Sequence, residues 1–282
     1  MLKKLCIALI ICLCVSLLGG CGEGNGTNKT AENSSSRAQE NTSDLPADIN
    51  GTALSIKYEK PYSAGRLKNS HSTVGSRVSG NISLSFEGYM PRFTSEISLA
   101  GADSIERYYE NMIGYTEFLR TRFLMQPPLP SDTPCTYYDY SDYRVDFVGE
   151  AYMSVTRYNE TYMGGEYVSH TFGADNFNLK TGRILSLGDL FGGDIESYTQ
   201  KLNALIYGEL KKHPSFPALF SEVKKDNLHE YIDNNTFVLT PNGLGFIFNE
   251  CEIAPHSSGT VNITVPYEAL DGILKINVFE KI

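Results

Sequence analysis

Side chains that could perform acid–base chemistry are few and scattered in this chain of 282 residues. Asp139 and Asp142 lie three positions apart, and Glu250 and Glu252 flank Cys251. Two carboxylates can act as general acid and general base when the fold holds both beside one substrate. Carboxylates at these spacings are more often solvated, so the four residues are only candidates for acid–base catalysis.

The histidines do not form a metal-binding pattern. A catalytic zinc ion needs three protein ligands, usually with some of them close in sequence, and the five histidines are far apart. The chain also lacks the G-x-S-x-G motif of a serine nucleophile. We therefore predict a protein that is not an enzyme and that carries no metal and no cofactor.

Tyrosine is the strongest compositional bias, with 18 tyrosines and no tryptophan. The densest cluster, at 137–143, includes Tyr137, Tyr138 and Tyr140. An exposed tyrosine is a rigid contact residue at protein interfaces, whereas a tyrosine in an antiparallel sheet is simply a good strand former. Both interpretations stay open for this cluster, and the three tyrosines are candidate ligand contacts.

The N-terminus has the pattern of an export signal. Lys3 and Lys4 precede an apolar run at residues 5–18, which is shorter than the ~20 residues that span a bilayer as a helix. The following Gly-Gly-Cys21 resembles the lipobox of bacterial lipoproteins. This resemblance implies cleavage before Cys21 and attachment of diacylglycerol to its sulfur. We expect residues 1–20 to be a signal peptide and the mature chain to be lipid-anchored at the outer face of the bacterial cytoplasmic membrane.

Charge and composition favour a tethered domain that does not bind nucleic acid. The formal net charge is -9, and the 24 basic residues are scattered among 33 acidic ones, whereas nucleic acid requires clustered Lys and Arg. Residues 21–50 comprise the lipidated cysteine and a segment almost free of large apolar side chains. Such a segment is a flexible tether with a mean reach of roughly 30 Å.

The remaining sequence predicts an α+β fold that begins with a small N-terminal α/β subdomain, residues 51–130. Strands are expected at 52–58 and 81–86 because apolar and polar residues alternate there. A helix is expected to follow with Asp103 as its N-cap and to end before Pro127.

Residues 131–282 predict an antiparallel sheet with one long packed helix. The helix is expected after Asp194, where apolar residues recur at helical spacing. The strands are expected within 143–163 and 167–179, and at 237–240, 244–248 and 260–265, with a turn at 180–182. Cys135 and Cys251 are the only thiols beyond Cys21, so they form either one disulfide or two separate buried thiols.

From about residue 143 onward, the order of several short sequence motifs resembles that in an extracytoplasmic domain of unknown function. This domain occurs in RsiV-type anti-sigma factors, which sense lysozyme, and in PdaC-type peptidoglycan deacetylases. The matching segments are 164–165, 176–182, 187–191, 248–249, 252–255, Gly259 and 265–268. The chain departs from the family at Tyr167, where a His is usual, and at Cys251, where a Tyr is usual.

The resemblance implies a ligand-binding module, because in RsiV this domain contacts lysozyme. The loop that contains Ala254, Pro255 and His256 is the candidate contact edge, and a purely structural turn is the alternative. We predict a non-catalytic surface lipoprotein that is held at the membrane by its lipid and binds a lysozyme-like protein or peptidoglycan. One alternative is a cell-wall-acting enzyme that uses the four carboxylates named above. The other is an assembly partner of another envelope protein.

Overall fold

The computed structural model describes residues 70–92, 100–125, 135–162, 167–192 and 195–279. Predictions for Cys21 and for the strand at 52–58 lie outside the described residues. The elements are β1 (Ser70–Ser79), β2 (Ile82–Pro91), α2 (Ala102–Leu124), β3 (Cys135–Val148), β4 (Tyr152–Tyr162), β5 (Ser169–Asn178), α3 (Leu187–Phe191), α4 (Ile195–Leu210), η2 (Phe216–Ala218), η3 (Lys225–Tyr231), β6 (Phe237–Leu239), β7 (Gly243–Phe248), η4 (His256–Ser258), β8 (Val261–Pro266) and η5 (Tyr267–Leu270). The fold is α+β, as predicted.

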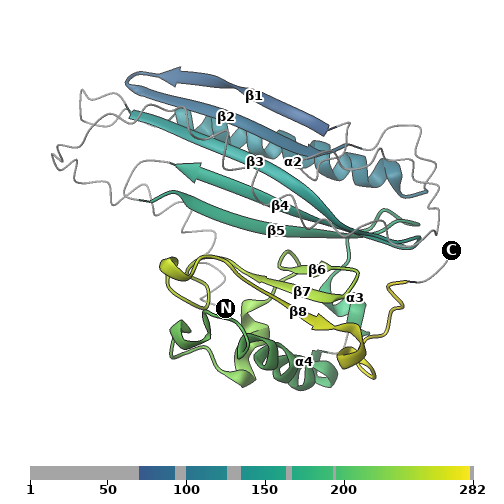
Figure 1. The fold of residues 1–282 in the computed structure, drawn as a ribbon. Helices are drawn as coiled ribbons and strands as arrows, with labels where there is room; N and C mark the ends of the chain where they lie inside the picture. Colours follow the sequence, from purple (N-terminus) through teal and green to yellow (C-terminus); the bar gives the residue numbers. More distant parts are fainter. Residues whose placement is uncertain (1–69, 93–99, 126–134, 163–166, 193–194, 280–282) are drawn as a thin grey trace.

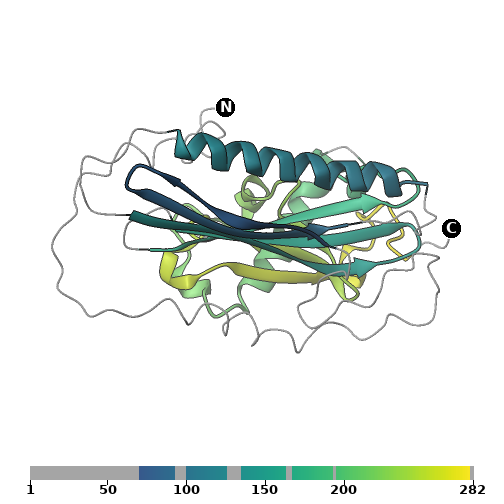
Figure 2. The ribbon, with the colours of Figure 1, turned by 90° about the horizontal axis from the view of Figure 1, so that it is seen from above.

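The larger sheet has the strand order β1-β2-β3-β4-β5 (Figure 1). Its neighbouring strands are antiparallel except β2 and β3, which run parallel. A parallel pair needs a crossover connection, and α2 provides it across one face of the sheet (Figure 2). The sheet is therefore continuous across the predicted division at residue 130, because β2 precedes that residue and β3 follows it.

Helix α2 lies on the sheet because its apolar side chains recur on one side. Ile105 and Tyr109 are fully buried, whereas Tyr115 and Phe118 on the other side are exposed. The helix begins one residue before Asp103. Asp103 is therefore in the first turn, where its charge complements the helix dipole, and is not the N-cap that the sequence predicts.

Two glycines fix the start of α2 against the turn after β5. The backbone N–H of Gly101 donates to the carbonyl of Leu179 at 3.1 Å. A Cβ atom on Gly101 would lie only 2.2 Å from the backbone nitrogen of Gly182, which itself has a φ of +69°. Glycine is required at both positions, by contact at one and by backbone conformation at the other. The turn predicted at 180–182 is confirmed.

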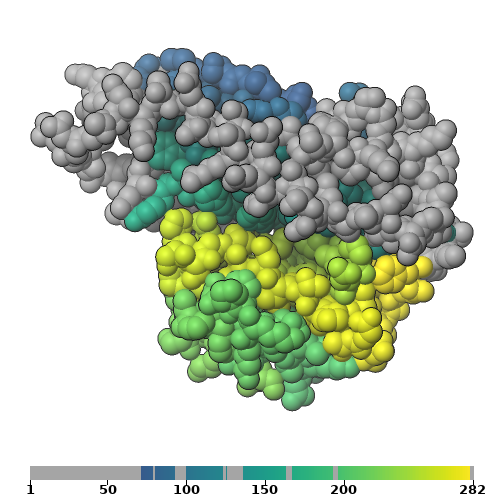
Figure 3. All heavy atoms as spheres, viewed as in Figure 1, coloured from purple at the N-terminus to yellow at the C-terminus, as the bar shows by residue number. Residues whose placement is uncertain are grey.

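The smaller sheet, β6-β7-β8, packs against α4 and against β4 and β5 of the larger sheet. These C-terminal elements form a lobe beneath the strands of the larger sheet (Figure 3). Leu202 and Ile206 of α4 and Phe246 of β7 are at most 1% exposed in its core. Between the sheets, the amide of Asn176 donates to the carbonyl of Phe237 at 2.8 Å.

Strands β6, β7 and β8 and helix α4 are confirmed where the sequence predicts them. Strand β1 is not predicted, because its sequence SHSTVGSRVS has only two large apolar residues. Its ten-residue antiparallel register with β2 provides the hydrogen bonds that hold it in place.

Candidate functional site

The tyrosine cluster lies within β3, and strand alternation divides it between two faces. Tyr137 is on the face toward α2, where it is only 3% exposed and packs with Ile82 and Leu84. Tyr138 and Tyr140 lie on the opposite face and are half-buried. Tyr137 is therefore a core residue, which corrects its prediction as a ligand contact.

The tyrosine face, as we call it, comprises Tyr138 and Tyr140 of β3 and Tyr158 and Tyr162 of β4. Figure 1 looks onto this side of the sheet, which α2 leaves uncovered. Tyr138 is directly opposite Tyr162, and their rings stack with centroids 5.9 Å apart. The rings of Tyr140 and Tyr158 meet edge to face at 6.2 Å. Cross-strand aromatic pairs of this kind hold the rings in fixed positions.

Carboxylates on this face accept hydrogen bonds from the tyrosine hydroxyls. Tyr138 donates to Glu160 Oε1 at 2.8 Å, and Tyr158 donates to Glu160 Oε2 at 2.6 Å. Tyr140 donates to Asp142 Oδ2 at 2.9 Å. Burial and the hydrogen bond to Glu160 raise the pKa of Tyr138 to about 12. The Tyr138 hydroxyl therefore remains a donor at neutral pH, and the side chains of Glu160 and Asp142 are held at fixed positions on the face.

His170 of β5 extends the tyrosine face toward the edge of the sheet. Its ring stacks on Tyr158 at a centroid distance of 6.0 Å, and its Nδ1 lies 2.8 Å from the Tyr158 hydroxyl. The same hydroxyl donates to Glu160, so it lies between the carboxylate and the imidazole. The three groups form one hydrogen-bonded chain on a half-buried surface.

The second set of candidate residues lies in the loop after β7. The side chain of Asn249 pairs with the backbone of Phe172 in β5: the Phe172 N–H donates to Oδ1 at 2.7 Å, and Nδ2 donates to the Phe172 carbonyl at 3.0 Å. Glu252 accepts the backbone N–H of Asn249 at 2.7 Å. The asparagine thus takes the place of a further strand and fastens the loop to the edge of β5.

His256 is the exposed group at the end of this loop. Its Nδ1 is 2.9 Å from Glu250 Oε2, and its ring contacts Tyr167, just before β5, at 4.9 Å between centroids. Pro255 is exposed, but Ala254 is 2% exposed and packs inside. The burial of Ala254 therefore corrects its prediction as a contact residue.

Strand β5 brings the two predicted sets of contacts together. The ring of Phe172 lies 5.0 Å from that of Tyr158 on the tyrosine face, and the backbone of the same residue binds Asn249 of the loop. We define the candidate surface as the tyrosine face, His170, and the loop at 249–258.

The thiol of Cys251 is free and exposed, so the disulfide with Cys135, one of the two alternatives from the sequence, is not formed, and Cys251 is not the buried thiol of the other alternative. Cys135 begins β3 and is paired with Ile82 of β2, whereas the loop with Cys251 is fastened to β5. Strand β4 separates β3 from β5 in the sheet.

Comparison with known proteins assigns part of the chain to a family model. Residues 188–268 match DUF3298, a protein family of unknown function. A DUF3298 family protein from Pseudomonas aeruginosa has a similar structure, with a TM-score of 0.54, 14% sequence identity, and coverage of 76% of this chain and 96% of the other. A DUF3298 family member from Bacteroides fragilis matches with a TM-score of 0.47 and 17% identity over 74% of this chain and 93% of the other. No curated protein matches the chain.

The matched segment includes only one part of the candidate surface. The DUF3298 match at 188–268 contains α4, the smaller sheet and the loop at 249–258. The tyrosine face, on β3 and β4, lies outside it. At 14% identity, the similarity to the Pseudomonas structure concerns the fold and says nothing about the individual residues of the candidate surface.

The four carboxylates that the sequence offers for an alternative role as an enzyme do not form one site. Asp139 faces α2, where it binds Arg120 at 2.7 Å, whereas Asp142 lies on the tyrosine face. Glu250 is paired with His256. Burial raises the pKa of Glu252, and the hydrogen bond from the Asn249 backbone opposes that shift.

A buried ionic network beneath α2 is not predicted by the sequence analysis. Arg120 is 4% exposed, and its Nε donates to Asp139 Oδ2 at 2.8 Å while its guanidinium lies 4.4 Å from the Phe86 ring centroid. The amide of Asn159 donates to the other Asp139 oxygen at 2.9 Å. Because each partner comes from a different element, no local spacing indicates the network.

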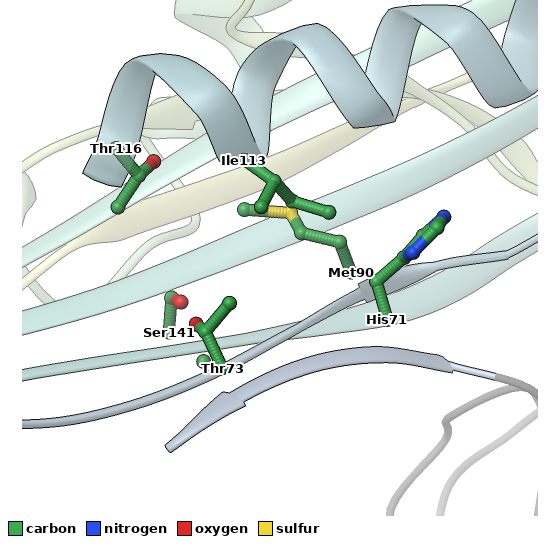
Figure 4. A pocket seen from close by; sticks show the side chains of 7 residues that line it. His71, Thr73, Met90, Ile113, Thr116 and Ser141 are labelled. Atoms are coloured by element: carbon green, nitrogen blue, oxygen red, sulfur yellow. The ribbon is translucent and has the colours of Figure 1, made fainter. Parts of the chain in front are cut away.

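A small cavity lies between α2 and the sheet, beside this network (Figure 4). It is lined by His71, Thr73, Gly88, Met90, Ile113, Thr116 and Ser141 and has a volume of about 10 Å³. That volume suits about one water molecule and is far below the ~300 Å³ of a small-molecule site. The cavity is therefore not a substrate pocket.

The described part of the chain has neither a cluster of metal ligands nor a helix suited to span a membrane. No group of three or more His, Cys, Asp or Glu residues there could hold a metal ion. None of the helices there is long and apolar enough to cross a membrane.

Proposed function

We propose that this chain is a non-catalytic bacterial surface lipoprotein, anchored through Cys21, that binds a lysozyme-like protein or a cell-wall glycan. The candidate surface is the binding region. The lipid holds the chain at the outer face of the cytoplasmic membrane, and residues 22–50 act as the tether. The resemblance to the extracytoplasmic domain of RsiV and PdaC supports this role.

The observation that carries the proposal is the convergence at β5. Phe172 of β5 links the two parts of the surface: its ring contacts Tyr158 beside the tyrosines and carboxylates of β3 and β4, and its backbone binds Asn249 of the loop that carries the exposed His256. Aromatic side chains with fixed orientation lose little entropy on binding, which suits recognition of a protein or a sugar ring. Negative charge from Asp142 and Glu160 suits a basic partner in particular.

The test is binding of the purified mature protein to immobilised lysozyme and, in parallel, to purified peptidoglycan, at low and high salt. The two salt concentrations separate specific binding from adhesion of an acidic protein to a cationic one. We expect binding to at least one of the two that persists at high salt. Binding to neither ligand would contradict the proposal, and so would turnover of peptidoglycan fragments by the protein.

A matched pair of variants assigns the binding to the surface. We expect the double variant Tyr138→Ala/Tyr162→Ala to lose binding, because it removes a stacked pair of the tyrosine face. Tyr115→Ala is the control, since Tyr115 is 62% exposed on α2 and lies outside the surface. Equal loss in both variants would place the binding elsewhere.

The anchor has its own test. We expect Cys21→Ser to abolish incorporation of labelled fatty acid and to release the protein from the membrane fraction. Retention of the label in that variant would contradict lipidation at Cys21.

A further inference from the structure

The two edge strands of the larger sheet, β1 and β5, differ in the hydrogen bonding of their outward backbone groups. Backbone groups along β5 are occupied: the N–H of Ala174 donates to the Asn235 carbonyl at 2.6 Å, and the carbonyl of Asn176 accepts the N–H of Leu185 at 2.7 Å. Strand β1 at the other edge has no strand beside it on its outer side in the described part of the chain (Figure 1). Alternate residues of an edge strand direct their N–H and C=O groups outward, so β1 is a template for another strand.

In the described part of the chain, β1 has neither the bulge nor the proline that often protects an edge. It pairs with β2 over ten residues without a register shift, and it contains no proline. Charged residues often block such edges, but the guanidinium of Arg77 is directed to α2, where it binds Glu117 at 2.6 Å and Thr121 at 2.8 Å. His71 is bound to Glu106 at 2.7 Å. The edge therefore carries no unneutralised charge that would repel a second copy.

Two apolar side chains are exposed along this edge. Val74 is 69% exposed and Val78 is 72% exposed, and both lie on the face opposite α2. Large apolar residues at these exposures on an edge strand gain stability when another strand covers them.

We propose that β1 pairs with β1 of a second copy of this chain, antiparallel, to form a symmetric dimer with one continuous sheet. The sequence of β1 is complementary to itself in one register, in which Val74 lies opposite Val78 of the partner subunit, and the reverse. A two-fold axis perpendicular to the sheet passes beside Ser76, which then lies opposite Ser76 of the partner subunit. Arg77 lies opposite Gly75 of the partner subunit, which has no side chain to obstruct it. An isologous contact of this kind closes at two copies.

The register gives a sharp cross-linking test with a matched control. Ser76 and Ser72 are the same residue type, and both are exposed on the same strand. In the dimer, Ser76→Cys places two thiols directly opposite each other, within the ~4.4–6.8 Å between Cα atoms that a disulfide requires. Ser72→Cys places its two thiols eight positions apart along the strands, about 26 Å at ~3.3 Å per residue.

The experiment uses the full chain, purified in detergent, with Cys251→Ser as the parent because Cys251 is exposed. After mild oxidation, a non-reducing gel measures the covalent dimer. We expect a dimer from Ser76→Cys, and only the background of the parent from Ser72→Cys. Equal dimer from both variants would indicate random collision, and dimer from neither would indicate no pairing; each result overturns the proposal.

A second pair of variants tests the apolar contacts without a new thiol. In the Ser76→Cys protein, Val74→Lys with Val78→Lys removes both cross-strand valine pairs, and we expect roughly tenfold weaker dimerisation. Phe118→Lys is the control, because Phe118 is 54% exposed on α2 and away from the edge. Unchanged dimer in the valine variant would overturn the proposed register.

Discussion

The two long helices, α2 and α4, cover layers of different chemical character. Beneath α2, buried carboxylates such as Asp139 and Asp175 are paired with arginines. Between α4 and the smaller sheet, the core consists of apolar side chains, with Leu202 and Ile206 fully buried. The polar residue that α4 buries is neutral: Asn203 donates to the Asp226 carbonyl at 2.8 Å, which fastens η3 to the helix.

This difference shows that the two layers depend on different interactions. An apolar core is stabilised roughly in proportion to the area removed from water and tolerates small changes of shape. A buried ion pair adds little net stability over an apolar pair, but loss of one partner leaves an uncompensated charge. In the α2 layer, a substitution that removes one partner of an ion pair should therefore cost more stability than a double substitution that replaces both partners by apolar residues.

The largest expected effect comes from Asp175→Ala. Asp175 is fully buried and binds Arg157 through both oxygens, at 2.7 and 3.1 Å. Removal of the carboxylate leaves the guanidinium without its partner, and we expect a loss of about 3–5 kcal/mol in the free energy of unfolding. The double variant Arg157→Met/Asp175→Leu should recover most of this loss. Urea denaturation measures both, and no recovery in the double variant would contradict the ionic account of the α2 layer.

The matching test of the other layer is Leu202→Ala in α4. Leu202 is fully buried, and we expect a loss of about 3 kcal/mol from the transfer free energy and the cavity left behind. Leu119→Ala on α2 is the control, because Leu119 is 38% exposed and should cost well under half as much. Similar losses at the two positions, measured by the same urea titration, would show that α4 does not cover a dry core.

Asp146 allows a test by pH, because its pairing differs from that of the other buried aspartates. Its partner Arg144 has a side chain that is 59% exposed, and burial raises the pKa of Asp146 despite that arginine and Thr156. A carboxyl whose pKa is raised by folding favours the folded state when protonated, and this contribution falls as the pH rises through the folded pKa.

We therefore expect Asp146→Asn to gain stability relative to the wild-type protein as the pH rises from about 3 to about 7. Unfolding by urea at several pH values across that range measures the difference. A constant difference between the two proteins would show that folding does not change the pKa of Asp146.

The smallest effect is expected at an exposed ion pair. Arg183 binds Asp189 at 2.6 Å, but its side chain is 64% exposed. Arg183→Ala should change the free energy of unfolding by at most about 1 kcal/mol, and the change should shrink further at high salt. A loss as large as that of Asp175→Ala would remove the distinction between buried and exposed pairs.

The parts of the fold that the sequence predicts are those with a strong local pattern. Helix α4 and strands β6, β7 and β8 have apolar periodicity and clear turn residues at their ends. Strand β1 lacks such a pattern, and the parallel pairing of β2 with β3 joins segments separated by the whole of α2. Long-range pairing of this kind leaves no local signal.

The candidate surface shows the same division. Tyr138 and Tyr140 are half-buried and His256 is exposed, so these three stay predicted contact residues. Tyr137 is buried because it has the opposite parity in β3, and a strand places alternate residues on opposite faces. Asn249 lies in a segment that carries the family resemblance, but the sequence does not indicate its role, because that role depends on the neighbouring edge of β5.

The sequence by itself determined the α+β class, most of the C-terminal elements, and the tyrosine bias, since each depends on composition or on spacing within one segment. Only the tertiary structure decided which face each tyrosine occupies, which arginine pairs with Asp139 and which with Asp175, and which edge of the sheet has no neighbouring strand in the described part of the chain. The physical reason is that these properties are set by contacts between segments far apart in the chain, and such contacts form only when the sheet brings the segments together.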